Sequence, residues 1–275
     1  QRAPFSAFFR PMPEAAVEAG ACPPGINKDI ELALFEQYRE SKSREVLLHA
    51  LESVSIPESN RQNVRPKGSK APILSMCLGM TECRFRGAMP SKATRERPVL
   101  AKLLCAFGRW ELPGFDFTSI QVNKDYASAM HVDKNDAGAS YIIGLGDYTG
   151  GQLWVDDGPR HGHLIDVRGR WHLLDGNLPH CVLPFQGRRY TVIFFSRICG
   201  GDVGENPTSA MAQQLLELGF PLPRRAPKPT QHPPAVERLE RAHRRFARLR
   251  ARARRRGGPC HMRLRLRMPG GDILH

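Results

Sequence analysis

A histidine and an aspartate stand two residues apart near the start of "MHVDKNDAGASYIIGLGDYTGG" (130–151). On an extended strand, residues i and i+2 point to the same face, so the side chains of His131 and Asp133 can converge on one point. Both residue types bind divalent metals, and a third protein ligand would leave half of an octahedral iron open for chemistry. Without such a partner, the pair is equally compatible with a strand-end histidine followed by a turn aspartate.

The third ligand is expected from a strand that is far away in sequence and adjacent in a rolled sheet. His180 meets this requirement, because it follows the turn "DGNLP" and opens the strand "HCVLPF". Its alternative interpretation is an ordinary polar residue at a strand start. A second histidine group, in "RHGHLIDVRGRWH", has no acidic ligand at a matching distance and is interpreted as a hairpin tip. Its members are His161, His163 and His172.

Two arginines enter the most apolar strand of the chain, in "GRRYTVIFF" (187–195). Arginine is costly to bury unless it is paired, so this placement indicates a fixed anionic partner. Arg189 and Thr191 share one strand face, and Arg188 and Tyr190 share the other. An arginine with a hydroxyl two residues later can hold a carboxylate through two hydrogen bonds. Arg188 and Arg189 remain alternatives for this role.

The elements that position these residues are expected to be mostly short strands. Turn residues separate the strand-like runs at near-even intervals. Such spacing favours a barrel or sandwich over a parallel α/β sheet. The expected strands cover residues 73–80, 117–122, 126–132, 140–146, 152–156, 163–167, 170–174, 180–184 and 189–196.

Helices are expected before, among and after these strands. Residues 26–54 alternate apolar and charged residues at helical spacing, as one interrupted helix or two. Residues 95–110 have the apolar pattern of a helix packed on a sheet. A closing helix over 206–220 has Asn206 as its N-cap candidate, and a further helix is expected over 235–256.

Composition divides the chain into three parts. Residues 1–72 are expected to form an N-terminal extension with helices and a polar linker, and residues 73–222 the strand-rich domain. Residues 223–275 contain a Pro-rich spacer and an Arg-rich tail. Residues 224–267 hold 16 Lys or Arg and 2 Glu, which accounts for the whole net charge of +14 and leaves the body neutral. The tail is either a phosphate-binding arm with salt-sensitive affinity or a solvated low-complexity extension.

The remaining composition is that of an ordinary globular protein, with 41% hydrophobic and 25% charged residues. No stretch approaches the roughly 20 apolar residues of a membrane-spanning helix. The seven scattered cysteines contain no Cys-x-x-Cys pair, which disfavours a zinc ribbon or a disulfide framework and predicts reduced thiols in an intracellular protein. The nucleus is one candidate compartment. Because the chain starts with Gln1 rather than methionine, it is expected to be a fragment, a processed form or an incomplete gene model, in which a targeting peptide could be missing.

The order of these motifs resembles that of the iron(II)/2-oxoglutarate-dependent dioxygenases over residues 73–220. "DYTGGQLWV" (147–155) is similar to their Gly-Gly-Glu-Leu turn and strand, with Gln152 in the Glu place. The run "IQVNKDYASAMHVDKNDAGASYIIGLGDYTGG" is most similar to the TET/JBP-like branch, which contains the TET and base-J DNA oxygenases, and to its algal and protist relatives.

The resemblance implies a mainly β fold with flanking helices and a double-stranded β-helix core, that is, a cupin-like jelly roll. His131, Asp133 and His180 would bind iron(II). 2-Oxoglutarate would chelate that iron and place its far carboxylate on Arg189, or Arg188, and on Thr191. O2 would be the second cosubstrate, with ascorbate as a reductant. Asn123 and Ser140 would contact cosubstrate or substrate, or else satisfy a turn or the backbone.

The branch resemblance predicts hydroxylation of a methyl group on a nucleic-acid base, in DNA or RNA. A flipped base needs a pocket with aromatic walls, for which Tyr148, Trp154 and Trp171 are candidates. One alternative is a protein side chain or small molecule as substrate, as in prolyl hydroxylases. Another is a non-catalytic binding module that keeps the barrel. The sequence does not indicate an oligomeric state.

Overall fold

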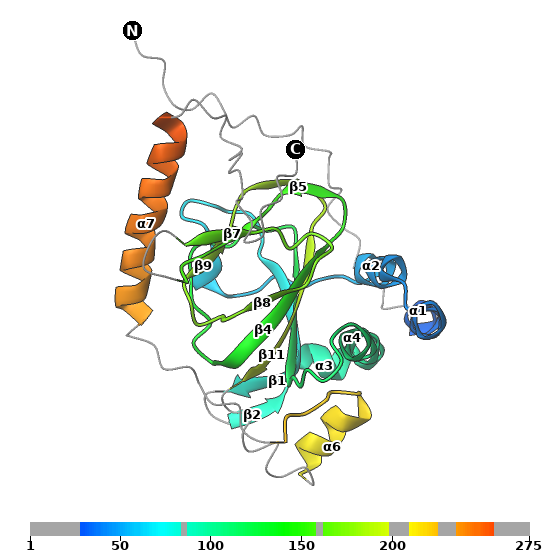
Figure 1. Ribbon diagram of the computed structural model, residues 1–275. Helices are drawn as coiled ribbons and strands as arrows, with labels where there is room; N and C mark the ends of the chain where they lie inside the picture. The colour runs from blue at the N-terminus through cyan, green and yellow to red at the C-terminus, as the bar shows by residue number, and fades with distance from the viewer. Residues whose placement is uncertain (1–27, 84–86, 158–161, 198–208, 225–234, 256–275) are drawn as a thin grey trace.

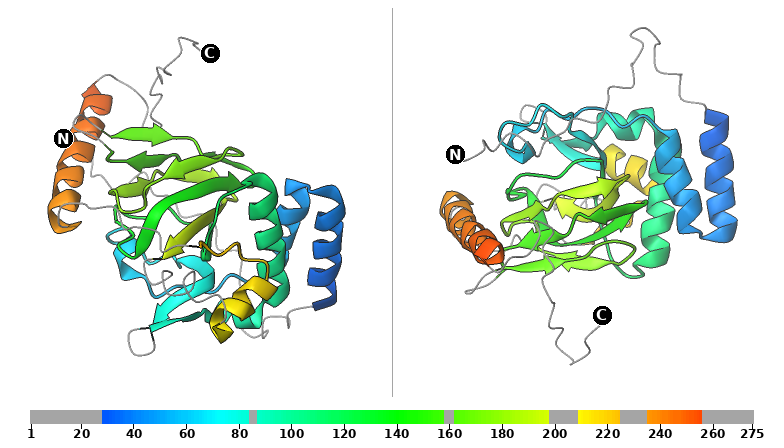
Figure 2. Two further views of the ribbon diagram at one scale, coloured as in Figure 1. Left: turned by 60° about the horizontal axis from the view of Figure 1, so that its bottom comes forward. Right: turned by 90° about the horizontal axis from the view of Figure 1, so that it is seen from above.

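The computed structural model describes residues 28–83, 87–157, 162–197, 209–224 and 235–255 (Figure 1). Two groups of antiparallel strands form the centre of the molecule, and most helices lie along one side of it (Figures 1 and 2). One further helix lies along the opposite side. The expected mainly β architecture with flanking helices is confirmed.

The larger sheet has six strands in the order β2-β1-β3-β11-β4-β8. All of its pairings are antiparallel, and a register shift between Phe194 and Ser196 interrupts the β11–β4 ladder. Its strands are β1 (Leu74–Cys83), β2 (Gly87–Pro90), β3 (Ser119–Lys124), β4 (Asp136–Leu145), β8 (His172–Leu174) and β11 (Tyr190–Arg197).

The second layer combines a three-stranded sheet, β7-β6-β9, with the pair β10-β5. Because β5 pairs with β10 and β6 pairs with β9, residues 148–155 run antiparallel to residues 180–187. A bridge between His131 and His180 adds one more chain segment beside β9. The strands are β5 (Tyr148–Gly150), β6 (Leu153–Val155), β7 (His163–Ile165), β9 (His180–Val182) and β10 (Phe185–Gly187).

From β3 to β11 the chain crosses repeatedly between the two layers, and only β6 and β7 follow each other within one sheet. In space, the strands of the larger sheet follow one another as β3-β11-β4-β8. In the second layer, the spatial order is the His131 segment, β9, β6 and β7. Strands adjacent in space are thus rarely adjacent in sequence, which is the winding of a jelly roll. The core is therefore a double-stranded β-helix, as expected.

Side-chain alternation along β11 separates the hydrophobic core from a pocket. Tyr190, Val192 and Phe194 belong to the core cluster beneath the helices, whereas Thr191 and Ile193 line the pocket between the layers. Because successive strand residues point to opposite faces, β11 has one face toward the core and the other toward the pocket.

Five of the helices lie on the side of the larger sheet that faces the hydrophobic core. The aromatic ring of Phe107 contacts those of Tyr38, Trp171 and Phe194, which ties two helices to the sheet. The helices are α1 (Lys28–Ser41), α2 (Arg44–Ser53), α3 (Lys92–Glu96), α4 (Pro98–Glu111) and α6 (Ala210–Glu217), with a short 3-10 turn, η1, at Gln62–Val64.

Several expected elements differ from those in the structure. The helix expected over 95–110 is two helices, because Pro98 has no amide hydrogen and starts a new helix at its first position. Ser209, rather than Asn206, caps α6 by accepting a hydrogen bond from the Ala212 amide at 3.2 Å. The strand expected over 126–132 is reduced to the bridge at His131.

Helix α7 (Ala235–Arg255) packs on the outside of the second layer (Figure 1). Ala242 is fully buried there, in a cluster with Trp154 and Cys181. The ring of Phe246 lies 5.1 Å from that of Trp154. The interpretation of the tail as a solvated extension is therefore wrong for these residues.

No helix among the described residues is long and apolar enough to cross a membrane. Some of the residues singled out in the sequence lie outside the described part of the chain. These are Cys22, His161, Cys199, Asn206 and Cys260.

Candidate metal centre and binding pocket

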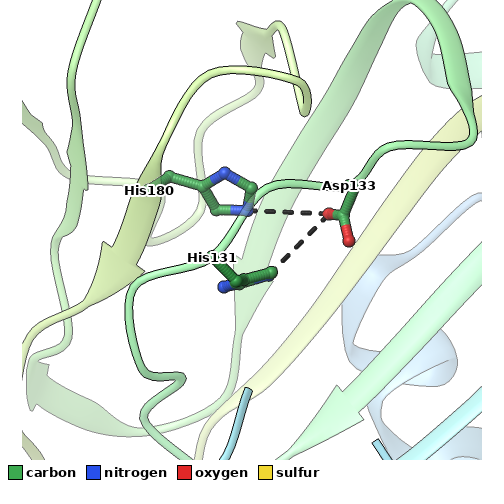
Figure 3. A group of neighbouring side chains, drawn as sticks. All are labelled: His131, Asp133 and His180. Atoms are coloured by element: carbon green, nitrogen blue, oxygen red, sulfur yellow. Dashed lines mark ion pairs between the residues drawn. The ribbon is translucent and has the colours of Figure 1, made fainter. Parts of the chain in front are cut away.

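Three side chains from two distant parts of the sequence meet between the two layers (Figure 3). The metal-binding atoms of His131, Asp133 and His180 all lie within 4.8 Å of one another. Oδ2 of Asp133 is 3.8 Å from Nε2 of His131 and 3.6 Å from Nε2 of His180. Both histidines are buried. The three residues predicted as a ligand set are therefore in one place, at a spacing that fits a single metal ion.

The backbone holds the two histidines opposite each other. The amide of His131 donates to the carbonyl of His180 at 3.0 Å, and the amide of His180 donates to the carbonyl of His131 at 3.0 Å. This double exchange is a hydrogen-bonded antiparallel pair, which sets the two residues side by side. A third hydrogen bond, from the Asp133 amide to the Gly176 carbonyl at 2.8 Å, places the aspartate beside them.

Hydrogen bonds also set the orientation of each imidazole ring. Nδ1 of His131 lies 2.8 Å from the carbonyl of Ala129, and Nδ1 of His180 lies 2.8 Å from the carbonyl of Leu178. A carbonyl only accepts, so each Nδ1 must carry the proton. Each Nε2 then has a free lone pair on the side facing Asp133, which is the arrangement of metal-binding histidines.

The charge states suit a divalent cation. Burial, together with the neighbouring His180, lowers the pKa of His131 to about 4. Burial raises the pKa of Asp133, but its electrostatic interactions with His131, His180 and Arg61 lower it by more, so the pKa lies below the ordinary value. The centre therefore offers neutral imidazole and anionic carboxylate, the donor set of two-histidine, one-carboxylate iron(II) sites.

Arg61 holds the second carboxylate oxygen of Asp133. Its Nη2 donates to Oδ1 at 2.6 Å, which leaves Oδ2 turned toward the histidines. Arg61 comes from the segment interpreted as a polar linker, 72 positions earlier in the chain. The amide of Ala129 donates to the carbonyl of Val64 at 2.8 Å and fastens that segment to the site. Sequence reasoning missed Arg61, because one arginine among several in a polar stretch carries no signal of its own.

A pocket of about 630 Å³ extends from the metal centre along β11. This volume is within the range of small-molecule sites. Apolar side chains from both layers line it beside the polar ones, including Ile142, Leu153 and Ile193. Among the residues predicted from sequence, it is lined by Asn123, His131, Asp133, Ser140, His180, Arg189 and Thr191.

Arg189 is the buried cation of this pocket, with 2% of its surface exposed. Its Nη2 donates to the carbonyl of Gly151 at 3.3 Å, and its guanidinium lies over the rings of Tyr148 and Phe185 at 5.4 and 5.5 Å. Within the described residues no carboxylate forms an ion pair with it, its Nε has no hydrogen-bond partner, and burial lowers its pKa. A guanidinium with five donors and so few partners fits an anionic ligand.

The Gly-Gly turn makes room for this arginine. Gly151 has a φ of +71°, and a Cβ added there would lie 3.0 Å from Nε of Arg189. Glycine adopts such a φ without steric cost and lets the backbone approach the guanidinium. The turn noticed in the sequence therefore shapes the wall around Arg189.

Hydroxyl and amide groups also line the pocket. The Asn123 amide donates to the Thr191 hydroxyl at 3.1 Å, and the Tyr126 hydroxyl donates to Oδ1 of Asn123 at 3.3 Å. The Ser140 hydroxyl is buried and has no hydrogen-bond partner among the described residues. Tyr126 was not predicted as a site residue. Its place after a strand gave no indication of where its ring would point.

Arg188 lies outside the pocket. Its side chain is 61% exposed, and its Nη1 donates to Oε1 of Glu52 on α2 at 2.9 Å. The two adjacent arginines point to opposite faces of the chain, as alternation requires. Of the two candidates for an anion site, the structure leaves only Arg189 in the pocket.

None of the three aromatic residues predicted as pocket walls lines the pocket. Trp154 faces α7 on the outside of the second layer. Trp171 packs on Phe107 and donates to Glu111 at 3.0 Å on the helix side. Tyr148 lies behind Arg189. The aromatic side chains that do line the pocket are Tyr126 and Phe195.

The second histidine group forms no metal centre within the described residues. His163 lies 2.9 Å from the half-exposed carboxylate of Asp157, and His172 contacts the Asp166 carbonyl at 2.9 Å. The two histidines belong to β7 and β8, which are in different sheets.

No protein-family model and no curated protein matches the sequence. Solved structures with a similar fold include an oxidoreductase of the 2OG-Fe(II) oxygenase family from Burkholderia pseudomallei, with 16% identity, a TM-score of 0.39, and 60% of this chain and 88% of that chain covered. NgTET1 in complex with 5mC DNA has 14% identity and a TM-score of 0.37, and the match covers 57% of this chain and 69% of that chain. A prolyl-4-hydroxylase from Pseudomonas putida has 17% identity and a TM-score of 0.30, and the match covers 63% of this chain and 89% of that chain.

These similarities are too distant to assign an activity, so the inference about function depends on the topology and the residues of the site. The chain has a double-stranded β-helix core whose pocket combines a His-Asp-His centre with a buried arginine that has no carboxylate partner in the described part of the chain.

Proposed function

We propose that this chain is an iron(II)- and 2-oxoglutarate-dependent dioxygenase. The observation that carries the proposal is that one pocket contains both the His-Asp-His centre and the buried Arg189. His131, Asp133 and His180 would hold iron(II), and Arg189 with Thr191 would bind the far carboxylate of 2-oxoglutarate. Iron(II) with 2-oxoglutarate and O2 supplies the oxidising power to hydroxylate a C–H bond.

The residues around these groups have separate tasks. Arg61 holds Oδ1 of Asp133, so that Oδ2 stays turned toward the histidines. The Ala129 and Leu178 carbonyls keep each imidazole in the tautomer that can bind a metal. Asn123 positions the Thr191 hydroxyl beside the guanidinium. Apolar walls exclude water from the space between centre and anion site, which protects reactive chemistry from side reactions.

For the substrate we propose a methyl group on a nucleic-acid base, in DNA or RNA. Two features support this choice: the resemblance of residues 120–151 to TET/JBP-like enzymes, and the arginine-rich helix beside the barrel. Tyr126 and Phe195 would take the role of the aromatic walls. Other polar side chains that line the pocket would contact the edge of a flipped base, among them Asn63 and Asn135.

The test measures succinate released from 2-oxoglutarate by the iron-loaded protein, with and without methylated DNA or RNA. Wild type is expected to form succinate, and Asp133→Ala none, because the variant lacks the anionic ligand. Arg188→Ala serves as the matched control, since this arginine lies outside the pocket. Mass spectrometry of the digested nucleic acid would detect hydroxymethylated bases.

Each outcome decides a different part of the proposal. Succinate that requires Asp133 but is unaffected by nucleic acid would keep the enzyme and move the substrate to a protein side chain or small molecule. No succinate from folded, iron-loaded wild type would contradict the dioxygenase and favour a binding module.

A further inference from the structure

Helix α7 has two chemically different faces. The inner face meets the barrel through Arg238, Ala242, Arg245, Phe246 and Leu249. The outer face carries further arginines and is exposed. Because residues three and four apart share a helix face, the division follows from the sequence pattern once the inner face is known.

The inner face is fastened by contacts of different kinds. Phe246 packs on Trp154, whose side chain is fully buried. Nη1 of Arg245 lies 2.5 Å from Oδ1 of the buried Asp156, and Arg238 donates to the carbonyl of Asn177. The apolar side of α7 is therefore occupied by the barrel.

The outer face presents a row of guanidinium groups. Arg241, Arg244 and Arg248 are exposed, and Nη1 of Arg244 lies 3.9 Å from a carboxylate oxygen of the equally exposed Glu240. At 1.5 Å of rise per residue, the row spans about 10 Å. The helix has nine arginines and no lysine. Arginine presents a planar fork of donors that matches the geometry of phosphate oxygens.

We propose that the outer face of α7, defined by Arg241, Arg244 and Arg248, binds the phosphate backbone of a nucleic acid. The charge is complementary, and one of the sheet strands beneath the helix, β9, begins with His180 (Figure 1). A membrane surface fits less well, because an interfacial helix inserts its apolar face and that of α7 is already buried. The choice of nucleic acid over another polyanion rests on the proposed function.

The experiment measures binding of a short fluorescein-labelled, methylated DNA duplex to the full chain by anisotropy. The test variant combines Arg241→Glu, Arg244→Glu and Arg248→Glu. The control variant makes the same change in charge with Lys92→Glu, Lys102→Glu and Arg109→Glu. These exposed residues belong to α3 and α4, on the side of the barrel opposite α7 (Figure 2). Thermal unfolding verifies that both variants are folded.

Wild type and control are expected to bind the duplex with equal affinity, and the test variant at least tenfold more weakly. Each phosphate contact contributes roughly 0.9 to the slope of log affinity against log salt, so losing three contacts lowers the slope by about 2.7. Titrations between about 50 and 200 mM salt resolve this change. Succinate formation without nucleic acid should be the same in all three proteins.

Unchanged affinity and slope in the test variant would overturn the proposal, and so would an equal loss in the control. Binding to phosphatidylserine vesicles that requires the same arginines, without duplex binding, would also overturn it. The dioxygenase proposal is judged separately, because it fails if wild type forms no succinate, whatever the duplex titrations show.

Discussion

Replacing Arg189 by methionine should weaken 2-oxoglutarate binding without destabilising the ligand-free protein. The guanidinium is 2% exposed, and within the described residues its Nε has no hydrogen-bond partner and no carboxylate pairs with it. A bound carboxylate would supply the missing partner. Removing one member of a buried charge pair costs about 2 to 5 kcal/mol. Taking about 3 kcal/mol, with 1.4 kcal/mol per tenfold, the affinity should fall roughly 100-fold.

The stability of the ligand-free variant separates this role from a structural one. Burying a cation without an anion is unfavourable, and burial accordingly lowers the pKa of Arg189. Methionine fills a similar space without charge. The midpoint of thermal unfolding should therefore be equal to or higher than that of wild type, although the contacts with Tyr148 and Phe185 change.

The assay is calorimetric titration of 2-oxoglutarate into protein loaded with Mn(II), which replaces the oxidisable iron, together with thermal unfolding of the metal-free protein. Arg188→Met is the matched control, because this neighbouring arginine is exposed and pairs with Glu52. It should bind 2-oxoglutarate like wild type. An equal loss of affinity in both variants would refute the reasoning, as would a strongly destabilised Arg189→Met protein with unchanged affinity.

Three further predictions concern the surroundings of the site. Arg61→Ala should weaken Mn(II) binding by about 10- to 100-fold, since it frees Oδ1 of Asp133, and an unchanged titration would contradict this role. Trp154→Ala should lower the free energy of unfolding in urea by about 3 to 5 kcal/mol, because its ring is fully buried beneath α7, whereas a loss below about 1 kcal/mol would contradict that packing. Cys181, a thiol whose pKa burial raises to about 12, should resist labelling in the full chain and react after removal of residues 235–275. Equal labelling of both proteins, located by mass spectrometry, would show that α7 does not cover it.

The sequence by itself indicated the chemistry and the class of fold. Two predictions needed only local periodicity. The first was that metal-binding residue types two apart on an extended segment share a face. The second was that an arginine shares a face with a threonine two residues later. The same is true of the short strands and of the helices over 26–54 and 235–256. Local elements of this kind follow from the pattern of neighbouring residues, so no knowledge of the fold was needed.

Which side chains of a strand point into the pocket depended on the tertiary structure. All three residues of β6, Leu153–Val155, are buried, because the barrel interior covers one face and α7 covers the other. Such a strand has no polar side to reveal which residues point inward, and Trp154 was for that reason wrongly expected in the pocket. The adjacent arginines posed the same problem, and only the position of β11 between pocket and helices separated Arg188 from Arg189.

Contacts between distant segments were likewise decided only by the fold. Arg61 reaches Asp133 across 72 positions, because the segment before β1 runs along the site. The segments 147–151 and 185–187 are bent by glycines with positive φ, yet they pair with each other as β5 and β10. The sequence predicted the helix over 235–256, but only the fold showed that the second layer covers its apolar residues. Local sequence determines which groups are available and how they alternate. Chain closure into the barrel determines which of them meet, because most stabilisation of short elements comes from packing.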